Sequence, residues 1–161
     1  MKLKQGNMWT AFDEADLFLV TCNSTLRKDG EIVMGRGCAL QAKRKFPDLP
    51  KAAGKWLQNY QHITGDSDYG ILIPYATIAD ASSEETKLGL FQVKHHFSQP
   101  AKLELIERSV DIALTSLDPM YQNVHLNFPG IGYGELDYKS VLPIVERLDN
   151  RFTVWTFEGG K

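Results

Sequence analysis

The stretch Asn127-Phe128-Pro129-Gly130-Ile131-Gly132-Tyr133-Gly134-Glu135-Leu136-Asp137 decides the predicted fold. It continues the apolar run 124–128, which predicts a buried strand, and a helical pattern begins soon after it, near residue 139. A strand, a glycine loop and a helix in this order present backbone N–H groups to an anion. Glycine lets a phosphate approach the backbone closely. A tight connection without a ligand would use the same residues, so the glycines alone leave both interpretations open.

The length and composition of the chain set limits on what it does. Its 161 residues predict a single domain, residues 1–161, with a hydrophobic core of its own. The net charge of -2 argues against bulk binding of nucleic acid, although it allows recognition of one modified end. Cys22 and Cys38 form no zinc-like motif, which favours free thiols in a reducing compartment. We find no signal-peptide pattern and no membrane-spanning run, and therefore expect a cytoplasmic protein without a membrane partner.

Predicted strands and helices alternate along the chain. The sequence predicts strands over residues 1–5, 15–22, 69–75, 88–94, 124–128 and 152–157. It predicts a turn of helix within 8–14 and longer helices near 37–46, 51–61, 101–117 and 139–148. The residues 47 and 50 are prolines, which predict a break between two of these helices. This alternation predicts a three-layer α/β/α sandwich with a mixed, mostly parallel sheet.

Several polar or glycine-rich segments follow predicted strands. Open α/β sheets bind ligands outside the carboxyl ends of their strands. The segments that fall there, or at a helix start just beyond, are Asn23, Met34–Cys38, Lys94 and Gly130–Gly134. Their convergence favours a ligand that carries phosphate.

Residues 30–40 match two common nucleotide-binding motifs in part, and each match lacks a required residue. Residues 30–36 have the spacing of a P-loop, but Arg36-Gly37 stands where Lys-Ser/Thr is required, which argues against a nucleoside triphosphatase. Residues 35–40 begin like a dinucleotide fingerprint, but Leu40 occupies the position of the third glycine. A Rossmann dehydrogenase is therefore set aside.

Lys94 and Asp137 are the candidate catalytic residues. Lys94 at the end of an apolar strand is either a solvated lysine or a partly desolvated amine with a lowered pKa, able to attack a carbonyl or a sugar carbon. Asp137 precedes a predicted helix, where an acid acts as a cap. It also follows the glycine loop, where an acid would serve proton transfer beside a bound sugar. Both interpretations stay open for each residue.

Four segments together resemble the macro domain family, which binds ADP-ribose, over nearly the whole chain. They are Gly6-Asn7-Met8, Val20-Thr21-Cys22-Asn23-Ser24-Thr25-Leu26, Val33-Met34-Gly35-Arg36-Gly37-Cys38-Ala39 and Phe128-Pro129-Gly130-Ile131-Gly132-Tyr133-Gly134. By this resemblance, the first segment contacts adenine, with Asn7 in place of the family's acid. Asn23 lies near the distal ribose, and the other two segments are the phosphate loops.

The first phosphate loop resembles one branch of the family in particular. Met34 stands where the branch with a water mechanism has an acid. The loop and the basic helix that ends in Lys45-Phe46-Pro47 are similar to the terminal ADP-ribose glycohydrolases and to the DNA ADP-ribosyl glycohydrolase antitoxins. That branch uses a lysine after the strand that precedes the long helix, which implies that Lys94 is the nucleophile. An aspartate follows its second loop, a role that Asp137 takes here, with Glu135 as the alternative.

The resemblance implies a site for ADP-ribose, or for an ADP-ribosylated end of a protein or nucleic acid, without a cofactor or metal. Besides Lys94 and Asp137, the implied site residues are Asn7, Met8, Cys22, Asn23, Ser24, Met34, Gly35, Arg36, Gly37, Cys38, Pro129, Gly130, Ile131, Gly132, Tyr133, Gly134 and Phe157. The expected function is a hydrolase that removes ADP-ribose from a modified protein or nucleic acid. An ADP-ribose 1''-phosphate phosphatase and an ADP-ribose reader without turnover are the alternatives.

Overall fold

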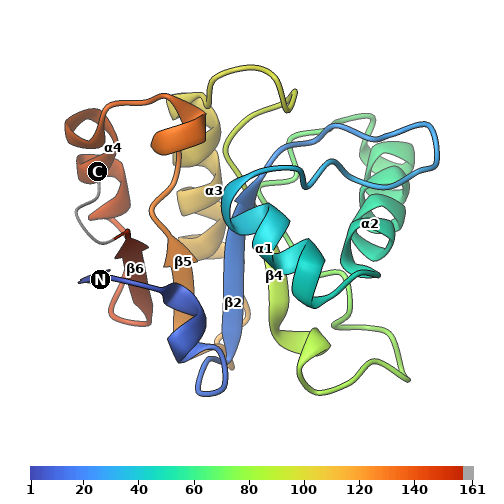
Figure 1. Cartoon of the computed structure of the whole chain (residues 1–161), viewed down its shortest axis with the longest axis horizontal. Coiled ribbons are helices and arrows are strands. Elements are labelled where there is room, and N and C mark those ends of the chain that lie inside the picture. The colour runs from blue at the N-terminus through green and yellow to red at the C-terminus, as the bar shows by residue number, and fades with distance from the viewer. Residues whose placement is uncertain (158–161) are drawn as a thin grey trace.

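One mostly parallel sheet forms the centre of the computed structural model, which describes residues 1–157 (Figure 1). Within these residues the sheet has six strands in the order β1-β6-β5-β2-β4-β3. The strands are β1 (Lys2–Gln5), β2 (Leu17–Cys22), β3 (Ile71–Leu72), β4 (Leu88–Gln92), β5 (Val124–Asn127) and β6 (Phe152–Thr156). The β3–β4 pair is antiparallel and the other neighbouring pairs are parallel. This arrangement confirms the predicted sheet. Residues 158–161 of the predicted domain lie outside the described part of the chain.

Helices cover both faces of the sheet. The α-helices are α1 (Gly37–Lys45), α2 (Leu49–Thr64), α3 (Leu103–Thr115) and α4 (Tyr138–Val145), and the 3₁₀ helices are η1 (Met8–Ala11), η2 (Glu85–Lys87) and η3 (Gly132–Gly134). Alternate residues of β2 enter two separate cores, as the two-residue period of a strand requires. Phe18 and Val20 pack into the core that includes α1 and α2. Leu17 and Leu19 pack into the core that includes α3 and α4. The predicted three-layer sandwich is therefore confirmed.

Several elements begin or end a few residues from their predicted bounds, and two of these differences have a local physical reason. The strand predicted over 69–75 is reduced to the two-residue edge strand β3. Gly70 before it has φ 72°, a left-handed conformation that interrupts the strand, and Pro74 after it has no N–H for a ladder. The predicted break between the two helices is present, because α1 ends at Lys45 and α2 starts at Leu49, but α2 begins before residue 51 and holds Pro50 in its first turn. A proline costs little there, since the first N–H groups of a helix have no partner within the helix.

The ladder between β2 and β5 is shorter than the ladder between β2 and β4. Pairing of β2 with β5 ends at Leu19 and Leu126, whereas pairing of β2 with β4 continues to Cys22 and Gln92. The strands β2 and β5 therefore separate toward their carboxyl ends. The loops that follow β2, β4 and β5 all leave from this edge. Among residues 1–157, no helix is both long and apolar enough to cross a bilayer.

Candidate functional site

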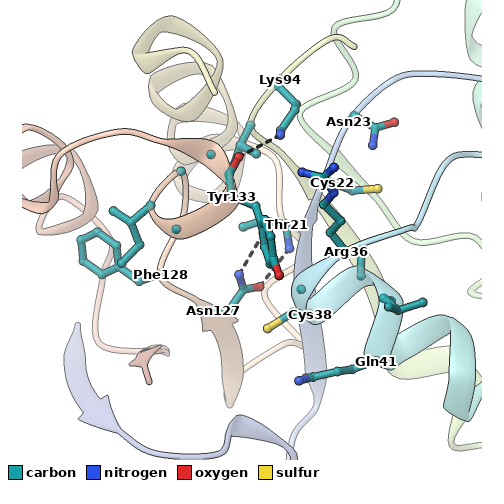
Figure 2. Close-up of a pocket in the computed structure, with 18 of the residues that line it drawn as sticks. Thr21, Cys22, Asn23, Arg36, Cys38, Gln41, Lys94, Asn127, Phe128 and Tyr133 are labelled. Atoms are coloured by element: carbon teal, nitrogen blue, oxygen red, sulfur yellow. Dashed lines mark hydrogen bonds between the residues drawn. The ribbon is translucent and has the colours of Figure 1, made fainter. Parts of the chain in front are cut away.

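A cavity of about 910 Å³ opens where β2 and β5 separate (Figure 2). The two strands contribute Thr21, Cys22 and Asn127 to its lining. The loops after β2, β4 and β5, the helix α1 and the end of β6 complete it. Its position is the edge at which α/β sheets bind ligands. Its volume suits a nucleotide-sized molecule, since small-molecule sites measure about 300–1,000 Å³.

Most of the residues predicted for the site line this cavity. They are Cys22, Asn23, Gly35, Arg36, Gly37, Cys38, Lys94, Gly130, Ile131, Gly132, Tyr133, Gly134 and Phe157. The others lie outside the described lining: Asn7, Met8, Ser24, Met34, Pro129 and Asp137. Asn7 caps η1 by accepting a hydrogen bond from the N–H of Trp9 at 3.0 Å, and Met8 is buried in the core. The lining therefore does not support the predicted adenine contacts of Asn7 and Met8.

The first glycine loop, Met34–Cys38, is held in place by the end of β2. The Asn23 Nδ2 donates to the backbone oxygen of Val33 at 3.0 Å, and the Asn23 Oδ1 accepts from the N–H of Thr25 at 2.9 Å. The loop leads into α1, whose first residues Gly37 and Cys38 line the cavity. No side chain caps this end of α1 within residues 1–157. Its first N–H groups are thus available to an anion in the cavity.

The second glycine loop, Gly130–Gly134, is anchored by backbone hydrogen bonds. Ala101 N–H donates to the Gly134 oxygen at 2.8 Å, and Leu136 N–H donates to the Gly130 oxygen at 2.8 Å. At its tip, the exposed Tyr133 ring lies 5.5 Å from the guanidinium carbon of Arg36 in the first loop. The two loops thus approach each other through a cation–π contact beside the cavity.

Lys94 follows β4 and extends toward the second loop (Figure 2). Its Nζ lies 3.5 Å from the backbone oxygen of Tyr133. Partial burial lowers the pKa of Lys94, the charge of Arg36 lowers it further, and the charge of Glu135 acts in the opposite direction. A lowered pKa increases the fraction of neutral amine, which is the nucleophilic form.

The two candidate acids occupy different positions. Asp137 is the exposed N-cap residue of α4, although its side chain makes no capping hydrogen bond. Glu135 lies directly after η3 with φ 65°, and its charge raises the pKa of Lys94 more than that of any other group does. Both side chains are exposed, and neither residue is part of the cavity lining within the described chain. The role predicted for Asp137 stays a prediction.

The cysteines of the cavity wall are free and buried. Burial raises the pKa of Cys22 to about 12 and the pKa of Cys38 to about 11. Thiols with such values stay protonated near neutral pH and are poor nucleophiles. Among residues 1–157, no cluster of three His, Cys, Asp or Glu side chains has the arrangement of a metal site.

The cavity also contains residues that the sequence did not single out as site residues. These include Thr21, Gln41, Arg44, Phe97, Asn127 and Trp155. For Gln41 and Arg44 a signal existed, because residues four and seven positions after Gly37 share its face of a helix. Asn127 also had a signal, because it is a polar residue at the end of a predicted apolar strand. Phe97 has no comparable signal, because it lies in a loop without periodicity.

Comparison with solved structures identifies the fold. The chain resembles the macrodomain of Thermus aquaticus DarG, with a TM-score of 0.62 and 24% identity over 98% of this chain and 97% of that one. It resembles the macrodomain of Mycobacterium tuberculosis DarG, with a TM-score of 0.65 and 22% identity over 95% and 96% of the two chains. Thermosipho africanus DarTG in complex with ADP-ribose matches with a TM-score of 0.69 and 18% identity, over 97% of this chain and 41% of that one.

The chain therefore has the macrodomain fold, as its sequence resemblance predicted. Two of these three solved structures are DarG macrodomains. No protein-family model matches the sequence, and no curated protein matches it.

Proposed function

We propose that this protein binds ADP-ribose in the cavity and hydrolyses the bond between ADP-ribose and a modified protein or nucleic acid. The observation that carries the proposal is the set of groups around one cavity: two glycine loops, the uncapped start of α1 and the Lys94 amine. The shared fold supports the choice of ligand, because the Thermosipho africanus DarTG structure contains ADP-ribose. The free thiols of Cys22 and Cys38 support a reducing compartment such as the cytoplasm.

The order of the strands gives the ligand a direction. Lys94 follows β4, whereas Phe157 follows β6, three strand positions away. At the usual spacing of neighbouring strands this separation is roughly 14 Å, which suits an extended ligand with a base and a sugar at its two ends. The exposed Phe157 ring would stack on adenine, and the distal ribose would lie beside Lys94. The diphosphate would lie between them, against the N–H groups of Gly37 and of the second loop.

Lys94 would act on the anomeric carbon of the distal ribose. Its neutral amine forms a C–N bond to this carbon while the bond from the carbon to the modified target breaks, and the target leaves with the proton that the amine gives up. Water then adds to the same carbon, the C–N bond breaks, and ADP-ribose and the free amine are restored. A carboxylate is required to move these protons. Glu135 is the stronger candidate, because its charge acts directly on Lys94.

The test compares release of ADP-ribose from modified protein and from modified DNA. We expect turnover by the wild type and none by Lys94→Met, which keeps the aliphatic stem without the amine. Calorimetry should show that Lys94→Met still binds ADP-ribose. The pair Glu135→Gln and Asp137→Asn then assigns the acid, because only the variant that lacks it should lose turnover.

Three results would contradict parts of the proposal. Turnover by Lys94→Met would remove its role as nucleophile. ADP-ribose binding without release from either substrate would leave a reader. Release of phosphate from ADP-ribose 1''-phosphate, unchanged in Lys94→Met, would point to the phosphatase instead. Absence of ADP-ribose binding by the wild type would overturn the proposed function altogether.

A further inference from the structure

Thr21 and Asn127, which both line the cavity, join β2 and β5 just beyond the last paired residues of the two strands (Figure 2). Here the Asn127 side chain takes the place of a backbone partner. Its Oδ1 accepts the N–H of Thr21 at 2.9 Å, and its Nδ2 donates to the Thr21 Oγ1 at 2.9 Å. The backbone of Asn127 stays paired with Trp155 of β6 on its other side. The strands can therefore separate without leaving the Thr21 N–H unpaired.

These two hydrogen bonds fix the direction of the Thr21 hydroxyl proton. A backbone N–H can only donate, so the Asn127 atom that faces it is the amide oxygen. The amide nitrogen must then face Oγ1, which accepts its hydrogen bond. The proton of the hydroxyl consequently points away from Asn127. Within residues 1–157 the Thr21 hydroxyl donates to no protein acceptor, and Thr21 is partly exposed in the wall of the cavity.

We propose that the Thr21 hydroxyl donates a hydrogen bond to the diphosphate of the ligand, and that Asn127 is the positioning residue that directs it. The inference rests on the proposed binding of ADP-ribose. Thr21 is the next-to-last residue of the central strand β2, and the start of α1 and the second glycine loop line the same cavity. The diphosphate oxygens of ADP-ribose are ionised near neutral pH and only accept hydrogen bonds, so they match a hydroxyl proton that has no protein acceptor. Hydrogen bonds to charged groups are the stronger class.

The experiment measures binding of ADP-ribose and of ADP by calorimetry to the whole chain. Thr21→Val removes the hydroxyl and keeps the branched shape, whereas Thr21→Ser keeps the hydroxyl. We expect Thr21→Val to weaken both ligands by roughly tenfold, and Thr21→Ser to bind nearly as the wild type does. Asn127→Ala should weaken binding in the wild type and have no further effect in Thr21→Val, because a positioning residue acts through the hydroxyl. Thermal unfolding checks that each variant is folded, and Thr21→Ala replaces Thr21→Val if the latter is not.

Three other outcomes would overturn the inference that the Thr21 hydroxyl binds the diphosphate. Equal affinity of Thr21→Val and Thr21→Ser would show that the hydroxyl is not used. A loss for ADP-ribose without a loss for ADP would move the contact away from the diphosphate. An additive loss in the double variant would show that Asn127 acts independently of Thr21. If the wild type binds neither ligand, the proposed function itself fails, a result that is distinct from these three.

Discussion

The two glycine loops face each other across one cavity, but Gly130 and Gly134 of the second loop satisfy constraints that Gly35 of the first loop does not. Gly130 has φ 81°, and a Cβ atom there would lie 2.6 Å from the Ile106 Cδ1. A Cβ atom on Gly134 would lie 3.1 Å from the Cβ of Ala101. Gly35 in the first loop has neither a positive φ nor any atom within 4 Å of such a Cβ. Packing and conformation thus explain glycine in the second loop, whereas neither explains Gly35.

This difference between Gly130 and Gly35 decides which loop is the stronger evidence for a binding site. The second loop shows the clearer glycine pattern in the sequence, yet Gly130 would be required even without a ligand. Gly35 lines the cavity with open space around it. Access of a ligand to the backbone is the remaining physical reason for glycine at this position. The first loop is therefore the better indicator of a binding site.

The largest effect is expected from Gly130→Ala, which tests the packing half of the comparison. The new methyl group would clash with the buried Ile106 side chain, and the alanine backbone would have to adopt a left-handed φ. We therefore expect a loss of about 3 kcal/mol in the free energy of unfolding. Gly65→Ala is the matched control, because Gly65 has φ 71° with nothing within 4 Å. It should lose only about 1 kcal/mol, the cost of conformation alone. Equal losses by denaturant unfolding would show that packing does not distinguish Gly130.

Gly35→Ala should have the next largest effect, and it should affect the ligand rather than the fold. The free energy of unfolding should change by less than about 0.5 kcal/mol, as at other unhindered sites. Affinity for ADP-ribose should fall by about tenfold, because a methyl group blocks approach to the loop backbone. Calorimetry and denaturant unfolding on the same preparation separate the two quantities. Unchanged affinity would remove the functional explanation of Gly35.

The loops should also move the pKa of Lys94 in opposite directions. The charge of Arg36 in the first loop lowers this pKa, and the charge of Glu135 after the second loop raises it. Arg36→Gln should therefore raise the pKa of Lys94. The neutral amine then forms only at higher pH, and the rate of the reaction that uses this amine should increase over the same higher pH range. Glu135→Gln should lower the pKa and move the amine titration to lower pH. NMR titration of labelled lysine measures both shifts, and shifts of the same sign would contradict the electrostatic assignment.

The smallest effect concerns the contact between the loops. The guanidinium of Arg36 lies over the exposed ring of Tyr133, and exposed cation–π pairs contribute about 0.5–1 kcal/mol. A double-mutant cycle with Arg36→Gln and Tyr133→Leu should give a coupling of this size in the free energy of unfolding. A coupling near zero would show that the loops are energetically independent in the absence of a ligand.

Periodicity and the strand-end rule predicted much of the fold and of the cavity from the sequence. The apolar run that became β2 indicated a strand buried on both faces, and both faces of β2 are in fact covered. The rule that ligands bind beyond strand ends selected Asn23, Lys94 and the glycine loops, and all of these except Met34 line the cavity. Local chemistry was less informative at Pro50, where a helix start tolerates the residue that breaks a helix elsewhere.

The sequence by itself determined the alternation of strands and helices, the parallel sheet and the positions of the loops, because these depend on hydrophobic period and on turn residues close together in the chain. Tertiary structure alone decided which polar groups meet. The hydrogen bonds between Thr21 and Asn127 join residues 106 positions apart. The charges of Arg36 and Glu135, which act on the pKa of Lys94, come from two separate loops. Such contacts depend on distances across the sheet, which no local pattern in the chain records.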